Sequence, residues 1–274
     1  MSGYNVTSEQ VVQEWVTMYG RGETYLRDTV NTEPMSVGSS SAVFALADNG
    51  APLQPRGANG LIPSYSPSDS QVRLSLQEGT FLETHPNFDM FTSQSGGLRK
   101  AMQERAVRKV KVGIDDEIMT ALETASTSAA IASISEASIL ERMSDLWANN
   151  VKDSITFLWT PRAWGKFLQV SKVTSTDYVE VKPLVGNPAM RGVNWAGATH
   201  MMMNGMEGEG TSTASCYVYG KDAVGYAQHI PDGNGVDAGV NAEQKYSWVN
   251  ACIYHKAGIL QQPGVIKLVH DDTA

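Results

Sequence analysis

The chain has 274 residues, which is enough for one large domain or two small ones with a hydrophobic core. Hydrophobic residues make up 42 % of the chain and charged residues 18 %, the balance of a folded protein. The formal net charge of −8 argues against a dedicated nucleic-acid binder, because such proteins carry a basic excess that neutralises phosphates.

Signals for export and for membrane insertion are not recognisable in the sequence. Residues 1–5 lack the basic region and apolar core with which a secretory signal begins. No apolar run approaches the ~18 residues that a membrane-spanning helix needs. We therefore expect a soluble protein that is made in the cytoplasm and has no membrane partner.

Residues 1–36 are predicted to form an N-terminal arm. Thr7 and Gln10 have the spacing of a helix capping box, and Trp15 and Tyr19 lie on the short apolar face that follows. An arm of this length cannot bury two aromatic side chains by itself. Trp15 and Tyr19 are therefore candidate contacts with the protein's own core or with a neighbouring molecule, and the position of the arm before a long loop favours the neighbour.

A long irregular loop then separates two predicted strands. The first strand is residues 42–46, and the second is marked by Val72, Leu74 and Leu76, which alternate with polar residues. Residues 47–71 between them are rich in glycine, proline and serine, and a loop of about two dozen residues is unusual inside a compact domain. Such a loop cannot bury its own backbone polar groups, so it is either disordered or reaches another molecule. We favour reach.

A single long helix is predicted after this loop. Its apolar residues recur at intervals of three or four and form one narrow stripe: Leu98, Met102, Ala106, Val110, Ile114, Ile118, Leu122 and Ala125. Its charges are segregated into a basic half and then an acidic half: Arg99, Lys100, Arg105, Arg108, Lys109 and Lys111, then Asp115, Asp116, Glu117 and Glu123. The helix macrodipole favours the reverse order, by about 0.3–1 kcal/mol per exposed charge. The pattern fits either a solvated amphipathic helix or a helix whose charges meet an external partner.

The next segment alternates helix, strand and helix. Ser133 and Glu136 repeat the capping-box spacing and are predicted to open a helix. The apolar face of that helix is predicted to comprise Ile139, Leu140, Met143, Leu146 and Trp147. Residues 154–159 are a predicted buried strand, and Thr160 and Pro161 then supply an N-cap hydroxyl and a proline at the first helical position. This order indicates a compact α+β unit.

The remaining segments are predicted to be mainly strands and loops. Residues 183–203 are interpreted as a loop followed by one strand, and residues 215–219 as a further strand that Gly220 ends. Residues 245–254 form a mixed apolar segment. Residues 263–269 are the predicted closing strand.

The sequence shows no catalytic or metal-binding constellation. No two of the five histidines are three or four residues apart, so neither a metal site nor a cofactor is predicted. Cys216 and Cys252 are too few for a disulfide framework and are interpreted as small buried hydrophobic residues. The pairs at 115–116 and 271–272 are adjacent carboxylates whose side chains diverge on a helix. The chain is not expected to be an enzyme.

Several of these segments together resemble the major capsid proteins of tailed bacteriophages. The part that resembles their extended loop comprises residues 41–44, 55–57, 60–63 and 71–74, with Glu83. The helix at about 93–125, with its polar run at 113–118, looks like their spine helix. The resemblance covers about residues 36–274 and implies an α+β fold of the HK97 type with a shell-forming, non-enzymatic role.

The resemblance also implies a division of the chain. The expected parts are an N-terminal arm at 1–36, an extended-loop hairpin at 37–91, the spine helix of a peripheral domain at 92–132, an axial domain at 133–236, and return strands of the peripheral domain at 237–274. In this arrangement the axial domain faces its copies around the capsomer axis. The two last apolar segments pair beside the spine helix.

The implied function is self-assembly through pentameric and hexameric capsomers into an icosahedral shell that encloses phage double-stranded DNA. The implied location is the virion, with assembly in the host cytoplasm. Other implied partners are scaffolding, portal and cement proteins, and DNA held by non-specific contact. Residues 99–111 are predicted to face the DNA or an acidic patch on a neighbour. The candidate inter-subunit contacts are Trp15, Tyr19, Arg56, Arg73, Arg99, Lys100 and Arg105.

Other classes of function stay open at this point. An encapsulin-like cellular nanocompartment would have the same fold and enclose cargo protein. An enzyme of unknown class would use scattered groups such as His200 or His229. A protein that decorates a shell from outside fits less well, because the long helix disagrees with the small β-rich chain expected of such proteins.

Overall fold

The computed structural model describes residues 24–34, 40–48, 50, 66–87, 97–151, 154–170, 192–231 and 235–273. The candidate contacts Trp15, Tyr19 and Arg56 lie outside the described residues, as do the predicted capping box of the arm and most of the predicted loop. None of the described helices is long and apolar enough to cross a membrane.

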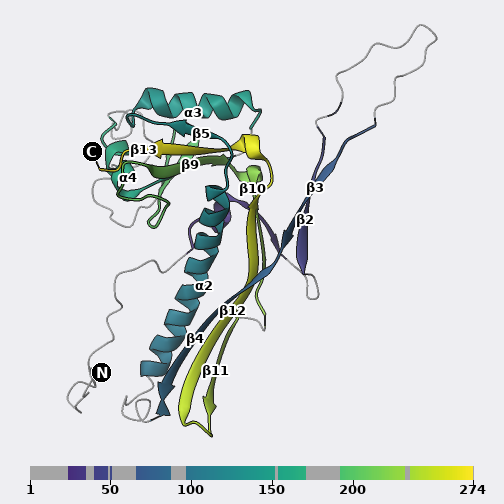
Figure 1. Ribbon diagram of the computed structural model, residues 1–274, viewed down its shortest axis with the longest axis vertical. Helices are drawn as coiled ribbons and strands as arrows, with labels where there is room; N and C mark the ends of the chain where they lie inside the picture. Colours follow the sequence, from purple (N-terminus) through teal and green to yellow (C-terminus); the bar gives the residue numbers. More distant parts are fainter. Residues whose placement is uncertain are drawn as a thin grey trace.

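Two sheets and a projecting two-stranded hairpin organise the described chain (Figure 1). The first half of the order contains β1 (Asn31–Pro34), β2 (Ser41–Leu46), β3 (Ser70–Ser75), β4 (Gln77–Pro86), α2 (Gly97–Glu123), β5 (Ser128–Ala130), α3 (Glu136–Ala148) and β6 (Ile155–Trp159). The second half contains α4 (Pro161–Phe167), β7 (Gly192–Trp195), β8 (Ala198–Met202), β9 (Ala214–Gly220), β10 (Val224–His229), β11 (Val236–Asn241), β12 (Tyr246–Ile259) and β13 (Val265–His270). The mixture of helices and sheets confirms the predicted α+β class.

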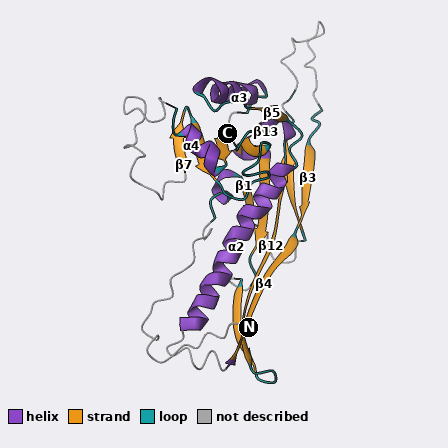
Figure 2. Cartoon of the chain, turned by 60° about the vertical axis from the view of Figure 1, so that its left-hand side comes forward, coloured by secondary structure: helices purple, strands orange, loops and turns teal. Residues whose placement is uncertain are grey.

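The longer sheet is built around β12, with which β10, β11 and β4 all pair antiparallel, while β1 adds to β10 in parallel. Side chains of β12 alternate between buried and half-buried along its 14 residues. Val249 and Ala251 of the buried set pack against Leu98, Met102 and Ala106 of α2. The helix therefore lies along one face of this sheet, as the two views agree (Figures 1 and 2).

The apolar stripe predicted for the long helix is confirmed. Every member from Leu98 to Leu122 is buried except Val110, which is half-buried. Ala125 lies beyond the helix, which ends at Glu123. The stripe changes neighbours along its length: its first half contacts β12, and its second half joins the core of the other sheet.

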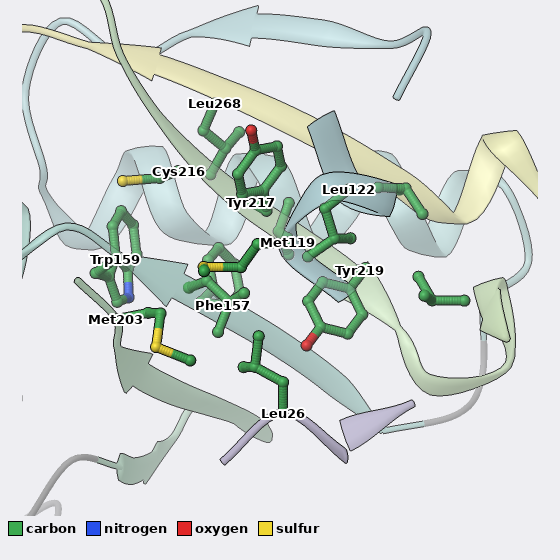
Figure 3. Close-up of a cluster of buried hydrophobic side chains, with 14 of the residues drawn as sticks. Leu26, Met119, Leu122, Phe157, Trp159, Met203, Cys216, Tyr217, Tyr219 and Leu268 are labelled. Atoms are coloured by element: carbon green, nitrogen blue, oxygen red, sulfur yellow. The ribbon is translucent and has the colours of Figure 1, made fainter. Parts of the chain in front are cut away.

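The other sheet has six strands in the order β5, β13, β9, β6, β8, β7. Its central strands β6 and β9 are buried on both faces, so both faces are covered. Met119 and Leu122 at the end of α2 lie beside Tyr217 and Tyr219 of β9 in this core (Figure 3). This packing fixes the direction in which α2 leaves the six-stranded sheet.

The two predicted helix starts in this unit have different outcomes. Thr160 caps α4 as predicted, accepting a hydrogen bond from the Ala163 amide, with Pro161 as the first helical residue. The predicted cap at Ser133 and Glu136 is wrong. Ser135 is the N-cap of α3, and its side chain and that of Ser138 bond each other's backbone amides. The Ser138 hydroxyl therefore accepts the hydrogen bond from the N-cap amide that was predicted for the Glu136 carboxylate.

The predicted apolar face of α3 is also wrong in part. Ile139, Met143 and Leu146 are buried, but Leu140 and Trp147 are 38 % and 53 % exposed. Each exposed residue follows a buried one, and one step along a helix turns the side chain by about 100°. Leu140 and Trp147 therefore lie on the flank of the helix.

Residues 192–203 form two strands where a loop and one strand were predicted. β7 and β8 pair antiparallel through a two-residue turn at Ala196 and Gly197, whose φ angles are 53° and 81°. Positive φ at both turn positions is the geometry that matches the twist of a hairpin. Ala196 adopts it although alanine gives no sequence signal for it, which is why the turn was missed.

The two C-terminal strands, β12 and β13, belong to different sheets. β12 lies along α2, whereas β13 pairs with β9 and β5 in the six-stranded sheet, so the expectation that both segments lie beside the long helix is wrong for β13. Conversely, β10 falls within the predicted axial segment but pairs with β12. Both sheets therefore draw strands from distant parts of the chain.

Candidate assembly surfaces

The hairpin of β2 and β3 is the first surface that projects from the body (Figure 1). β3 and β4 are separated by Leu76 alone, so the strand that belongs to the long sheet continues almost directly into the hairpin. The hairpin lies where the sequence predicts two strands around a long loop. It is therefore an extension of the sheet and not an independent domain.

The root of the hairpin is packed on a glycine of β12. Ala42, Phe44 and Leu74 form a buried cluster with Ala227 and Leu260. A Cβ atom at Gly258 would lie 2.6 Å from Leu74 Cδ2, which is closer than real side chains approach. The absence of a side chain at Gly258 lets the hairpin approach the sheet closely and sets its direction.

Arg73 lies on the outward face of this hairpin. It pairs across the strands with Val43, which is 45 % exposed, while the alternating residues Phe44 and Leu74 face the cluster. Arg73 is exposed and has no ion-pair partner in the part of the chain that the structure describes. The hairpin thus presents on its outward face a cation that no described residue pairs with.

The basic half of α2 is the second surface. Arg99, Lys100 and Lys109 are exposed, and Arg108 and Lys111 are half-exposed. Within the described ranges, the only partner that any of these five meets is Glu104, which lies 3.9 Å from Lys100 in an exposed pair. Exposed pairs of this kind contribute about 0.3–0.5 kcal/mol. Among the residues that the structure describes, the charge of this face is therefore almost uncompensated.

Arg105 differs from the other basic residues of α2. Its guanidinium donates two hydrogen bonds to Glu83 of β4, and the same carboxylate lies 3.0 Å from His85 Nε2. Burial alone would raise the pKa of Glu83, but the hydrogen bonds from Arg105 and His85 outweigh it and lower the pKa. Arg105 therefore forms an ion pair that links α2 to the long sheet within one subunit.

Two carboxylates in the acidic half of α2, Asp115 and Glu117, are compensated within the chain. Glu117 forms an ion pair of 2.8 Å with Lys256 of β12. Asp115 is fully buried and accepts hydrogen bonds from the Thr24 hydroxyl and from the amides of Tyr25 and Leu26. These contacts explain why carboxylates occur toward the helix C-terminus against the macrodipole. They also attach the segment that precedes β1 to the helix.

A second buried carboxylate fixes the end of the chain. Asp272 is fully buried, accepts from the Thr160 hydroxyl at 2.9 Å and from the Gly210 amide at 3.0 Å, and lies 3.1 Å from His270 Nε2. It therefore joins the N-cap of α4 to the glycine-rich turns before β9. Asp115 and Asp272 had no sequence signal beyond belonging to adjacent carboxylate pairs.

The described residues offer no reactive centre. No group of three or more His, Cys, Asp or Glu among them could hold a metal ion. His200 is buried between Phe157 and Phe167, accepts from Trp159 Nε1 and donates to the Trp195 carbonyl, and burial lowers its pKa to about 3. It is a neutral core histidine and not a candidate base.

The two cysteines and the groove at the hairpin root also show no reactive centre among the described residues. Cys216 is buried as predicted, and burial raises the pKa of its thiol to about 12, whereas Cys252 is half-buried, so that prediction is wrong for it. A shallow groove of about 280 Å³ lies at the hairpin root between Phe44, Asp222 and Gln261. No cluster of titratable groups converges on it.

Comparisons with known proteins agree with one another. The sequence matches the phage capsid protein family over residues 5–272. No match was found among curated protein sequences. Similar solved structures include one from Mycobacterium phage Che8 (16 % identity, TM-score 0.68, 93 % of this chain and 94 % of that chain). Another is the capsid of Ralstonia phage GP4 (9 % identity, TM-score 0.69, 94 % of both chains).

A third similar structure is the capsid asymmetric unit of cyanophage Pam1 (10 % identity, TM-score 0.67, 100 % of both chains). At these identities the likeness establishes the fold, which is the HK97-like capsid fold. None of the comparisons favours a cellular compartment or an enzyme. Since the family match spans nearly the whole sequence, the chain belongs to the phage capsid protein family.

Proposed function

We propose that this chain is the major capsid subunit that assembles through pentamers and hexamers into an icosahedral shell around phage double-stranded DNA. Its place in the capsid of the virion follows from the family. Assembly in the host cytoplasm, scaffolding, portal and cement partners, and non-specific contact with the packaged DNA belong to the proposal. So does a structural role without catalysis of any kind.

The projecting hairpin is the observation that carries the proposal. The hairpin leaves the body as a direct extension of β4, and its outward Arg73 has no ion-pair partner among the described residues, which suits the hairpin to contact a neighbouring subunit. In the proposed shell, residues 47–71 lie over an adjacent subunit, and Arg56 and Arg73 form ion pairs there. The arm at 1–36, with Trp15 and Tyr19, clamps a neighbour, and Arg99 and Lys100 lie at a subunit contact.

The proposed domain division follows the same scheme. Residues 37–91 serve as the extended loop, residues 92–132 as the spine helix, residues 133–236 mainly as the axial domain, and residues 237–274 partly as return strands. The strand exchange by β10 and β13 supports two domains that share strands.

Size-exclusion chromatography with light scattering, followed by negative-stain imaging of each peak, tests the proposal. We expect rings of five or six subunits or closed shells. Each specific contact in them would bury ~1,600 Å² in total. A protein that remains monomeric at high concentration and with candidate scaffolding protein would contradict the proposal.

A further inference from the structure

Gly113 lies in the interior of α2, where no close contact requires a glycine. Glycine inside a helix is less stable than alanine, because its backbone loses more conformational freedom on folding. Packing explains other glycines of this protein, such as Gly258, where an added Cβ atom would lie against Leu74. At Gly113 an added Cβ atom would meet none of the described atoms within 4 Å. The helix therefore contains a weakening residue that its own packing does not demand.

The residues beside Gly113 also favour a helix only weakly. Residues 107–114 include four side chains with a branched Cβ atom: Val107, Val110, Val112 and Ile114. Such side chains lose rotational freedom in a helix. The cations Arg108 and Lys111 are one turn apart on the same stretch and repel each other. By contrast, residues 98–106 are all strong helix formers, so the weak part of α2 is confined to the middle.

Polar contacts hold α2 on either side of this stretch but not within it. On the N-terminal side, Arg105 donates hydrogen bonds to Glu83 of β4. On the C-terminal side, Asp115 accepts hydrogen bonds from residues 24–26. In the described part of the chain, no side chain of residues 107–114 takes part in a hydrogen bond or an ion pair. The two ends of α2 are thus held separately, and apolar packing alone holds the middle.

The weak stretch lies where the buried stripe changes neighbours. Val110 packs both against the cluster of Val249 and Ala251 and against the core of the six-stranded sheet, and Ile114 is the first stripe residue inside that core. The first half of α2, with the ends of β4, β11 and β12 beside it, extends away from the six-stranded sheet (Figures 1 and 2). We call this part the long-sheet extension.

The stiffness of α2 limits how far the long-sheet extension can bend. Strands twist readily without losing their ladder of hydrogen bonds. Among the described elements, α2 is the only helix that lies along this extension (Figure 1). A weak stretch in α2 at the boundary of the extension is therefore placed where bending would change the angle between the extension and the six-stranded sheet.

Rings of five and of six identical subunits require different angles between neighbouring copies. A rigid subunit could repeat the same contacts in only one of the two rings. A subunit that bends can keep the packing of its six-stranded sheet in both rings while its extension follows the neighbour. The proposed function requires both rings from this one chain.

We infer that residues 107–114 are a bending segment of α2, which sets different angles of the long-sheet extension in pentamers and in hexamers. The inference rests on the proposed function, in which both rings occur. Gly113 is the point of least stiffness, and the contacts of Arg105 and Asp115 keep the two flanking parts of the helix intact. The glycine and the branched residues are thus retained for a change of shape and not for the stability of one subunit.

Two substitutions that strengthen the helix test the bending segment. Gly113→Ala adds a methyl group in open space, whereas Val107→Ala removes atoms from a side chain that is 42 % exposed. Both favour a continuous helix over a bent one. Each should reduce the ratio of closed shells to open hexameric sheets or tubes about threefold, and the double variant should reduce it about tenfold. Electron microscopy of the assembled material measures this ratio.

Gly165→Ala in α4 is the matched control. An added Cβ atom at Gly165 also meets no described atom within 4 Å, so this variant strengthens a helix outside α2 and should leave the ratio unchanged. Thermal unfolding establishes that each variant folds. Hydrogen exchange of the unassembled subunit adds a direct measurement: amides of residues 107–114 should exchange about tenfold faster than those of residues 118–122, and Gly113→Ala should slow them.

Electron cryomicroscopy of the unmodified shell compares the two rings directly. α2 should bend within residues 107–114 by different amounts in pentamers and hexamers. Helices of one shape in both rings would overturn the inference, as would an unchanged ratio in the double variant. If Gly113→Ala changes the ratio and Val107→Ala does not, the added methyl group obstructs a neighbour, and the inference is wrong.

Failure of the inference is distinguishable from failure of the proposed function. If the unmodified chain forms neither rings nor shells, the proposed function itself fails. If it forms shells that contain both rings and α2 has one shape throughout, the proposed function stands and only the bending segment is refuted.

Discussion

At the scale of single residues, buried carboxylates hold together segments that are distant in the sequence. Asp115 receives three donors from residues 24–26, and Asp272 joins α4 to the turns before β9. A buried carboxylate is tolerated only where donors replace its water. The hydrogen bonds of both carboxylates thus stabilise the contacts between segments that are distant in the sequence.

Replacing Asp115 by alanine should destabilise the protein by about 2–4 kcal/mol, because a buried donor left without a partner costs ~1–3 kcal/mol. Denaturant unfolding measures this change. Limited proteolysis should cut near residues 24–26 faster in the variant. Asp237→Ala, which removes an exposed carboxylate on β11, is the control and should change stability by less than ~0.5 kcal/mol. Equal effects of the two substitutions would refute the role of Asp115.

His200 should make the subunit sensitive to acid. Its pKa is about 3 in the folded protein and 6.5 when unfolded, so below pH 6.5 the unfolded chain binds the extra proton. Stability is therefore complete above pH 6.5 and falls as the pH decreases toward 3. The loss between pH 7 and 4.5 is about 3 kcal/mol at ~1.4 kcal/mol per unit.

Urea unfolding at pH 7, 6 and 4.5 measures this dependence. His200→Phe keeps a ring in the stack but cannot take up a proton, so its stability at pH 7 should be lower and its pH dependence flatter. Burial lowers the pKa of His255 as well, so a residual slope of the same sign should persist. A slope that is identical in the variant and the unmodified protein would exclude His200 as the source.

At the scale of elements, the root of the hairpin depends on close packing. Gly258→Ala would place a methyl group against Leu74 and should destabilise the protein by about 1–3 kcal/mol, the usual cost of overpacking. Thermal unfolding measures the loss. Adding Leu74→Ala should cost less in this background than in the unmodified protein, since it relieves the clash. Strict additivity of the two substitutions would show that they do not interact.

At the scale of the whole molecule, the loop that connects β2 and β3 should matter for assembly and not for folding. Replacing residues 49–67 by Asn-Gly, a turn suited to a two-residue hairpin connection that keeps the register of β2 and β3, should leave the melting temperature of the monomer within a few degrees. The yield of closed shells should fall at least tenfold, because the proposed overlap with a neighbour is gone. Thermal unfolding measures the melting temperature, and light scattering with electron microscopy measures the yield of shells. Shells of normal yield and stability would show that the loop between β2 and β3 is not required for assembly.

The sequence by itself determined the elements whose pattern is local. The period of the α2 stripe, the alternation in β3 and the cap at Thr160 all follow from neighbouring residues, and they were sufficient to indicate the α+β class, whereas the capsid fold was indicated by the resemblance to a known family. The same reasoning named Arg73, Arg99 and Lys100, which are exposed and, within the described ranges, have no partner beyond the weak pair of Lys100 with Glu104.

Tertiary structure alone decided which surfaces are free. Arg105 has the same local pattern as Lys100, yet Glu83, distant in sequence, neutralises only Arg105. Leu140 and Trp147 fit an apolar face by spacing, but the core accepts only the narrower set at Ile139, Met143 and Leu146. The reason is physical: periodicity fixes which residues share a face, whereas burial depends on what packs against it, and here strands from both ends of the chain supply that packing.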